Sequence, residues 1–402
     1  LAAAAFVNNV FNLAIIFATG FSYGLTPLIG MLQGGGNTQG IGRVFRNALA
    51  ANASVAVLLT AVMYTVYCFV DKLGQPEELL PHIRPYFVLQ LISLLFIMLF
   101  NGFRQFAEGL TDTRTPMWIL LGGNALNIFG NYLLIYGSFG FPEWGLFGAG
   151  VSTLVSRIVM LLVFIGVVAV ARRYKVYREA ILRSRFNRND FMQLNALGWP
   201  IALQMGMETA AFSLSAIMVG WLGSIPLAAH QIMISVSTIG FMVYYGMGAA
   251  LAVRVSHFMG QKDFPNLRRA VNSGMGIILS LAIVASLFFY LARTPIIYSF
   301  TEDHEVMIVV SSLIFSLIVY QFGDALQITF ANALRGTTDV KPMMWIAFFS
   351  YFIVALPVGY LCGFTWGGGV VGVWVAFPAG LFTAGFLFWL RFRYRLQQLM
   401  KK

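Results

Sequence analysis

Long apolar stretches occupy most of this chain and restrict it to one class of fold. The chain has 402 residues, of which 59% are hydrophobic and 10% are charged. An α-helix needs about 20 apolar residues to cross a bilayer, whereas the strands of a membrane barrel are shorter and alternate in polarity. We therefore predict an all-α polytopic membrane protein. Eleven stretches qualify as spans: 5–31, 47–70, 86–106, 117–137, 146–171, 197–222, 228–256, 271–293, 306–330, 343–363 and 368–391.

An internal repeat divides these stretches into two sets. Residues 1–48 align with 227–274 without a gap, at an offset of 226 residues and with eight identities. Duplication of a helical membrane unit is typical of secondary transporters. The sequence therefore predicts two pseudo-symmetric six-helix bundles. Three later matches keep nearly the same register: Pro116 with Pro342, Gly145 with Gly369, and Gly148 with Gly372.

The repeat also predicts how the chain is divided. Segment 196–226 opens the second copy, but its counterpart would precede Leu1. We therefore expect one helix before Leu1 and twelve helices in the complete protein. The expected parts are an N-terminal lobe at 1–171, a polar linker at 172–195, and a C-terminal lobe at 196–402 that ends in a basic tail.

The basic residues predict the orientation in the membrane. The formal net charge is +11, and 22 of the 26 basic residues lie in alternate connections or in the C-terminal tail. Cytoplasmic loops carry such an excess of Lys and Arg. The rule places the 172–195 linker and the C-terminus in the cytoplasm, and residue 1 outside. The same distribution argues against a nucleic-acid partner and favours contact with anionic membrane lipids.

Two acidic residues lie deep inside apolar stretches, whereas the other acids occur in connections or near helix ends. They are Glu208 and Asp324. A charged side chain at the bilayer centre costs roughly 2.5–3.5 kcal/mol on insertion scales, so acids there are commonly functional. A buried carboxyl group can exchange H⁺ near neutral pH. Two carboxylates with a phenol oxygen and carbonyls can instead hold Na⁺. The structural alternative is an acid paired with an arginine or a backbone group.

The two halves differ in their polar residues. At the offset of 224 that relates Gly145 to Gly369, the repeat alignment places Phe100 opposite Asp324, so the first half has no equivalent acid. It offers Asn127 and Asn131 instead, one helical turn apart and therefore on one face. Such an amide pair either locks two helices together or lines a polar cavity.

One arginine, Arg157, lies within a span and needs a partner, for which we expect a structural role. The sequence has no Walker A lysine motif, no His-Glu-x-x-His motif and no Gly-x-Ser-x-Gly motif. We therefore expect no ATP-driven pump, no enzymatic activity and no cofactor.

Five blocks carry a resemblance to a known family. They are Gly198-Trp-Pro-Ile-Ala-Leu-Gln-Met-Gly-Met-Glu208, Leu227-Ala-Ala-His-Gln231-Ile, Tyr320-Gln-Phe-Gly-Asp324-Ala-Leu-Gln327, Ala333-Leu-Arg-Gly336 and Ala355-Leu-Pro-Val-Gly-Tyr360. Together they resemble the multidrug and toxic compound extrusion (MATE) family, in its NorM-like branch. The resemblance implies twelve helices in two lobes arranged as a V. It also implies export of cationic amphiphiles in exchange for Na⁺ or H⁺ across a bacterial inner membrane.

The resemblance assigns roles to individual residues. It places a cation site at Glu208, Tyr320 and Asp324, with Na⁺ as one candidate ion. It implies four substrate-binding residues, which are Gln231, Asp303, Asn127 and Asn131. The family usually places a further acid on its first helix, for which this sequence shows no counterpart.

Two other functions remain open from the sequence. A lipid-linked oligosaccharide flippase of similar fold is the nearer alternative, although a flippase cavity is expected to be cationic and the deep charges here are mainly acidic. A non-transporting membrane scaffold or receptor is the second, but it has little reason to keep two deep acids. We expect the protein to be a monomer.

Overall fold

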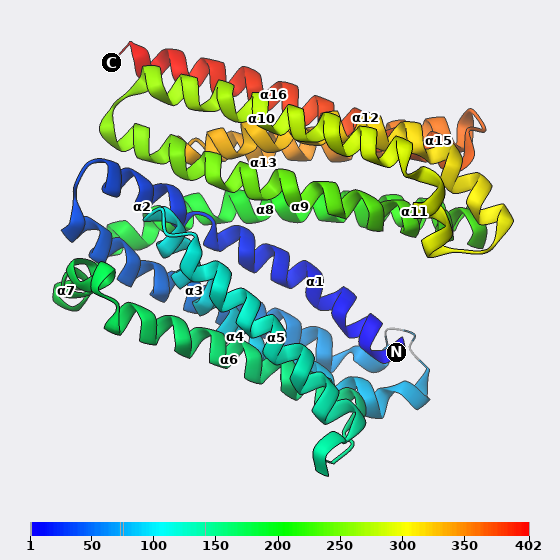
Figure 1. Ribbon diagram of the computed structural model, residues 1–402, viewed down its shortest axis with the longest axis horizontal. Helices are drawn as coiled ribbons and strands as arrows, with labels where there is room; N and C mark the ends of the chain where they lie inside the picture. Colours follow the sequence, from blue (N-terminus) through cyan, green and yellow to red (C-terminus); the bar gives the residue numbers. More distant parts are fainter. Residues whose placement is uncertain (1, 73, 75, 141, 402) are drawn as a thin grey trace. The chain divides into compact units, whose positions relative to one another are not determined.

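The computed structural model describes residues 2–72, 74, 76–140 and 142–401. The described chain is helical, and eleven helices or helix runs in it are long and apolar enough to cross a membrane, which confirms the predicted spans. Most helices extend beyond the apolar stretches because they continue into polar end residues. The α-helices are α1 (Ala2–Ser22), α2 (Leu25–Gly34), α3 (Thr38–Cys68), α4 (Leu80–Gly109), α5 (Arg114–Tyr136), α6 (Gly145–Val170), α7 (Lys175–Arg183), α8 (Arg188–Gly220), α9 (Ser224–Gln261), α10 (Phe264–Leu291), α11 (Arg293–Phe300), α12 (His304–Gly336), α13 (Lys341–Phe348), α14 (Leu356–Tyr360), α15 (Gly369–Trp374) and α16 (Ala376–Met400) (Figure 1).

Contacts divide the chain into two compact units, Leu1–Ala202 and Leu203–Lys402. The division falls inside α8, so the first half of that helix belongs to the first unit and the second half to the second unit. In the first unit α4 packs against α1, α3 and α6. In the second unit α12 packs against α9, α10 and α16. Each unit therefore has one central helix, α4 or α12.

The two central helices end in the same unusual way. Thr111 follows α4 with φ 66°, and Thr338 follows α12 with φ 57°. Positive φ is uncommon for residues other than glycine. In each case the next residue is an aspartate whose backbone N–H bonds a carbonyl of the last turn, at 2.9 Å for Asp112 and 3.0 Å for Asp339. The shared ending confirms the internal repeat.

The helix bounds correct the register that the sequence alignment suggested. The two central spans run over Glu77–Gly109 and His304–Gly336, with 33 residues each. Their offset is therefore 227, and Ile97 rather than Phe100 is the counterpart of Asp324. The length difference lies later, in the loop before Gly145, which is longer than the loop before Gly369. Ile97 and Phe100 are three residues apart, so their side chains differ by about 60° in direction around the helix axis.

Each aspartate after a central helix is anchored to another element of its unit. The Asp112 carboxylate accepts hydrogen bonds from the hydroxyls of Thr115 and Tyr174, both at 2.6 Å. Burial favours the neutral form of this carboxyl, but the hydrogen bonds from Thr115 and Tyr174 outweigh it and lower the pKa of Asp112. Asp339 pairs with Arg391 on α16 through two contacts, at 2.7 and 3.0 Å. These contacts fix the ends of α4 and α12.

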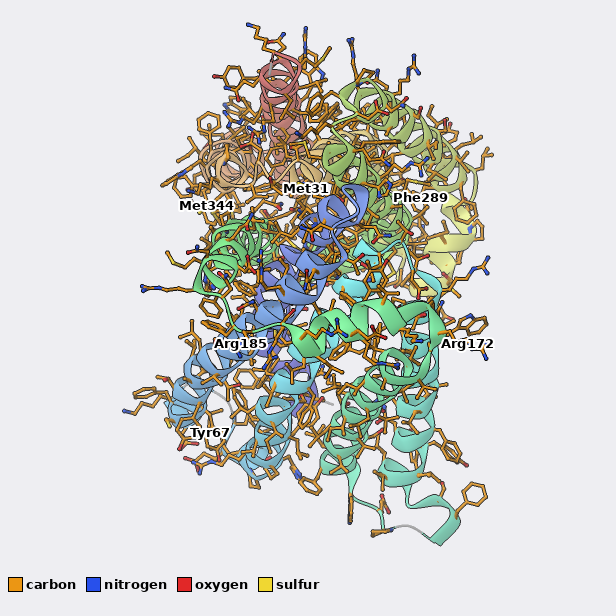
Figure 2. All side chains as sticks on the ribbon, turned by 90° about the vertical axis from the view of Figure 1, so that its left-hand side faces the viewer. Met31, Tyr67, Arg172, Arg185, Phe289 and Met344 are labelled. Atoms are coloured by element: carbon orange, nitrogen blue, oxygen red, sulfur yellow. The ribbon has the colours of Figure 1, made fainter. Side chains whose placement is uncertain are left out.

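The segment between the predicted lobes contains the short surface helix α7. Figure 2 labels Arg172 and Arg185, which lie on either side of α7. It packs on α3, where a Cβ at Gly42 would lie 2.5 Å from the backbone of Ala180. The Tyr177 hydroxyl also donates a hydrogen bond to Gln33, at 2.9 Å. The segment is therefore docked on the first unit.

The tenth span is not a regular α-helix. Two π-helical segments, Phe349–Ala355 and Leu361–Thr365, flank the short α14. Pro357 lies in the first turn of α14. Proline removes a backbone donor from a helix, and π segments are frequent at functional sites. The first π segment carries Tyr351, which interacts with Glu208 on α8.

Candidate functional site

Glu208 is held by two amide side chains. It lies on α8, partly exposed, and its Oε2 atom accepts hydrogen bonds from Gln204 Nε2 at 2.9 Å and from Gln327 Nε2 at 3.1 Å. Gln204 is one turn earlier on the same helix, whereas Gln327 comes from α12. Hydrogen bonds to an ionised group are about twice as strong as neutral ones. The two amides therefore favour the carboxylate form.

A buried arginine extends this network. Arg335 lies near the end of α12 with 6% exposure, and its Nη2 donates a hydrogen bond to Gln204 Oε1 at 2.7 Å. The guanidinium charge also interacts favourably with Glu208. The amide of Gln204 therefore connects the buried guanidinium to the partly exposed carboxylate of Glu208, which partly offsets the cost of desolvating the two charges.

Asp324 has a contrasting environment. It lies on α12 with 1% exposure, and neither carboxylate oxygen has a hydrogen-bond partner among the described residues. Its carboxylate charge interacts electrostatically with Glu208 and with the phenols of Tyr320 and Tyr244. A buried charge without partners is costly. Asp324 is therefore suited to hold a proton or a cation.

More polar atoms without partners surround Asp324. The hydroxyl of Tyr244 on α9 and both side-chain polar atoms of Gln321 on α12 have no hydrogen-bond partner in the described chain. Gly240 faces them, because a Cβ there would lie 3.0 Å from Gln321 Oε1 and 3.2 Å from the Tyr244 hydroxyl. The glycine leaves room for this polar cluster inside the helical bundle.

The donor set fits a hard monovalent cation or a proton. Hard cations take oxygen ligands. Asp324 interacts with the phenols of Tyr320 and Tyr244, and Gln321 and the Tyr244 hydroxyl both face Gly240. These side chains offer oxygen atoms, which suit Na⁺ or H⁺. No cluster of three or more His, Cys, Asp or Glu side chains suited to a metal occurs in the part of the chain that the structure describes.

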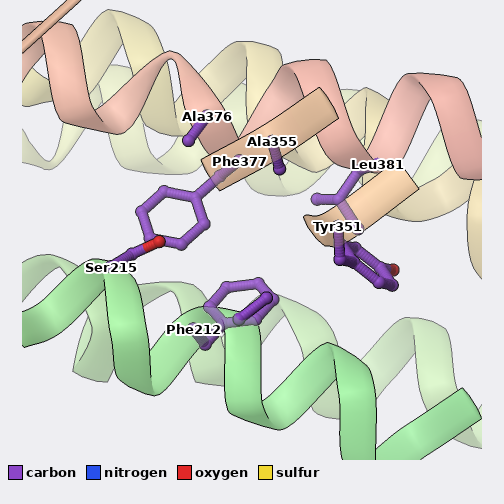
Figure 3. Close-up of a pocket in the computed structure, with 8 residues that line it drawn as sticks. Phe212, Ser215, Tyr351, Ala355, Ala376, Phe377 and Leu381 are labelled. Atoms are coloured by element: carbon purple, nitrogen blue, oxygen red, sulfur yellow. The ribbon is translucent and has the colours of Figure 1, made fainter. Parts of the chain in front are cut away.

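An aromatic pocket lies next to these acids. Its lining includes Phe212 and Ser215 from α8, Tyr351 from the π segment, and Phe377 from α16, which points toward α8 in Figure 3. The rings of Phe212 and Phe377 stack with centroids 4.8 Å apart, and Tyr320 meets Phe212 edge to face at 6.3 Å. The pocket volume of about 10 Å³ accommodates about one water molecule. Aromatic faces attract organic cations.

The other residues with implied roles lie elsewhere. Gln231 is exposed on α9, and Asp303 is the N-cap of α12, where its side chain accepts hydrogen bonds from the backbone of Glu305 and Val306. Neither hydrogen-bonds to Glu208 or Asp324 within the described residues. The structure therefore brings Glu208, Tyr320 and Asp324 together but does not add these two. Their substrate-binding role stays a prediction.

The two asparagines belong to the first unit and tie α5 to α6. Asn127 Nδ2 lies 3.4 Å from Ser152 Oγ and 3.3 Å from Thr153 Oγ1. Asn131 Nδ2 donates to Asn127 Oδ1 at 3.3 Å, so the two amides share a face as predicted. The Asn131 Oδ1 atom has no hydrogen-bond partner among the described residues. The pair therefore locks two helices, while one oxygen stays available to a ligand.

Arg157 also finds its partners inside the first unit. It donates hydrogen bonds to Gln90 Oε1 at 3.2 Å and to Ser93 Oγ, both on α4. These contacts connect α6 to α4 and support the expected structural role.

Five residues of the site were not predicted from the sequence. Gln204 sits one turn from Glu208, and amides at that spacing face the same way, so this signal was present. Arg335 and Gln327 belong to the blocks that carry the family resemblance, but no role was predicted for either. No sequence signal marked the remaining two, Tyr244 and Tyr351.

The hydroxyl of Tyr351 interacts with Glu208 electrostatically but lies outside hydrogen-bond geometry. Because Tyr351 lines the aromatic pocket and also interacts with Glu208, the pocket lies beside the acidic pair within the second unit.

The sequence is similar to those of known proteins. The family model described as MatE matches residues 1–133 and 200–361. The multidrug resistance protein NorM of Photobacterium profundum is 30% identical over 408 residues, covering 98% of this chain and 87% of that protein. NorM of Aliivibrio fischeri is 30% identical over 394 residues, covering 96% and 85%.

Solved structures show the same fold. An outward-facing multidrug resistance MATE family transporter superposes with a TM-score of 0.90 at 20% identity, covering 100% of this chain and 89% of that chain. A eukaryotic MATE transporter superposes with a TM-score of 0.85 at 16% identity, covering 99% and 90%.

Proposed function

The chain belongs to the MATE family of membrane transporters, and on that premise we propose that it is a secondary active antiporter. It exports cationic amphiphilic drugs or toxic organic compounds in exchange for Na⁺ or H⁺. The observation that carries the proposal is the buried carboxylate of Asp324, whose oxygens have no hydrogen-bond partner in the described chain and whose charge acts on Glu208.

The acidic pair provides the coupling. An organic cation is attracted to the same pair of carboxylates that attracts the coupling ion, so the two ligands compete. Each ligand favours a different population of conformations, and the free energy of this competition couples the two movements. Asp324 supplies the negative charge, Tyr320 and Tyr244 supply oxygen atoms beside it, and the aromatic rings of Phe212 and Phe377 offer faces to an organic cation.

The remaining features of the proposal concern location and partners. The protein is a multi-pass membrane protein, and its bacterial relatives support a place in the bacterial inner membrane. We place the C-terminus and the segment around α7 in the cytoplasm, because both are basic. The protein acts as a monomer, contacts anionic lipids, and uses no cofactor, nucleic acid or enzymatic step.

Transport in proteoliposomes tests the proposal. Vesicles loaded with a fluorescent organic cation are compared under an imposed Na⁺ gradient and an imposed H⁺ gradient. We expect one gradient to drive transport, and we expect Asp324→Asn to abolish the driven component, because an amide carries no charge to exchange. Ser286→Ala removes another buried polar group of the second unit that has no hydrogen-bond partner in the described chain, and it serves as the control.

Two results would contradict the antiporter. Undiminished gradient-driven transport by Asp324→Asn would remove Asp324 from the mechanism. Absence of transport under either gradient, combined with translocation of a lipid-linked oligosaccharide in the same vesicles, would establish the flippase alternative.

A further inference from the structure

We propose that the two acids have different tasks, and that Gln204 and Arg335 create the difference. Glu208 stays ionised throughout the transport cycle and provides a fixed negative charge beside the ion. Asp324 alone takes up and releases the coupling ion. Gln204 is a positioning residue, which acts on the ion through Glu208. The inference deepens the proposed antiport and rests on it.

The first step is the orientation of the Gln204 amide. Arginine donates hydrogen bonds but accepts none, and an ionised carboxylate accepts them but donates none. Gln204 lies between Arg335 and Glu208, at 2.7 and 2.9 Å. Only one orientation of the amide satisfies both neighbours, with Oε1 toward Arg335 and Nε2 toward Glu208. Protonation of Oε2 would set a new O–H against the amide N–H groups that already point at it, so the two amides oppose protonation at that oxygen.

The second step is the contrast between the two carboxyl groups. Burial disfavours the charged form of both carboxyl groups. At Glu208 two hydrogen bonds to Oε2 and the charge of a buried guanidinium oppose this effect. Both oxygens of Asp324 lack such bonds in the described chain, and the charge that acts on it is the like charge of Glu208. Hydrogen bonds to the charged form favour ionisation, whereas a neighbouring like charge disfavours it. Holding Glu208 ionised therefore increases the tendency of Asp324 to bind a cation or a proton.

The third step is the set of other titratable groups around the pair. Tyr320 on α12, Tyr351 on the π segment and Tyr244 on α9 face the two acids. These phenols add oxygen ligands but no positive charge. Arg335 is therefore the charge that distinguishes Glu208 from Asp324, and it reaches Glu208 through Gln204.

Ion binding to the purified protein without substrate tests the division of tasks. Na⁺ binding is measured by isothermal titration, and H⁺ uptake is measured in weakly buffered detergent solution. At saturating ion concentration we expect one ion per wild-type protein, one in Glu208→Gln with a lower affinity, and none in Asp324→Asn. Two ions in the wild type, no ion in Glu208→Gln at saturation, or no ion in the wild type would overturn the inference. None of these outcomes depends on whether an organic cation is transported.

A matched pair of variants tests the positioning role. Gln204→Leu and Gln327→Leu each remove one amide donor from Glu208, but only Gln204→Leu also removes the link to Arg335. We expect Gln327→Leu to keep one ion per protein, and Gln204→Leu to bind a second ion, at Glu208. Arg335→Leu should resemble Gln204→Leu, and Arg335→Lys, which keeps the charge, should bind one ion.

A merely structural role for Gln204 predicts a different result, in which both glutamine variants lose stability yet bind one ion each. That result would overturn the positioning role. If the Gln204 and Arg335 variants do not fold, the Glu208→Gln and Asp324→Asn stoichiometries still decide the division of tasks.

Discussion

Replacing Gln204 by leucine should destabilise the second unit more than the same change at Gln327. Gln204 makes two hydrogen bonds to charged groups, at 2.9 Å to Glu208 and 2.7 Å to Arg335, whereas Gln327 makes one such bond, at 3.1 Å. A hydrogen bond to a charged group contributes about 1.5–3 kcal/mol. We therefore expect a loss of about 3–6 kcal/mol for Gln204→Leu and about half of that for Gln327→Leu. Leucine nearly fills the volume of glutamine, so the cavity term is small.

The measurement is the free energy of unfolding from reversible SDS titration in mixed micelles. The double variant Gln204→Leu/Arg335→Leu distinguishes the contribution of the Gln204–Arg335 hydrogen bond from that of packing. Removing both partners destabilises less than leaving one partner buried without a hydrogen bond. The double variant should therefore lose about 1–3 kcal/mol less than the sum of the single variants. Equal losses for the two glutamine variants, or strict additivity in the double variant, would refute the reasoning.

Two further predictions concern the ends of the central helices. Asp112 has a lowered folded-state pKa, so the stability it contributes is fully present above the ordinary Asp pKa of about 4 and is lost as pH falls through the lower folded-state value. The free energy of unfolding of Asp112→Asn, measured from pH 7 down to pH 3, should lack this acid-dependent loss. A pH profile identical to that of the wild type would contradict the prediction. A Cβ at Gly336 would lie 2.7 Å from Val255 Cβ, so Gly336→Ala should cost about 1–3 kcal/mol, whereas Gly122→Ala, which meets nothing within 4 Å, should not destabilise the protein in the same assay.

The spans were predictable because burial in lipid imposes one requirement on every residue in them. A run of about 20 apolar residues can satisfy its backbone in a membrane only as a helix or a closed barrel. The ends were less predictable, because polar caps extend the helices beyond the apolar runs. Asn37 and Asp263 show this, since each accepts a backbone hydrogen bond at the first turn of its helix.

The acids of the site were predictable for an energetic reason, and their partners were not. A carboxylate in a span is costly, so Glu208 and Asp324 stand out in the sequence. Gln204 and Gln327 are neutral, and a neutral amide inside a bundle most often packs helices together. Only the fold shows that both point at Glu208. The register error at Phe100 has a similar origin, because identities in apolar helices are too few to locate a length change.

The π segment that carries Tyr351 allows the residues of its helix to change their rotation about the helix axis. A π turn contains one residue more than an α turn, and one residue corresponds to about 100° of rotation. Converting Phe349–Ala355 to α-helix would rotate the residues on one side of the segment about the helix axis, relative to the residues on the other side. Tyr351 could thereby leave Glu208 by axial rotation alone, without any sliding of the helix through the membrane.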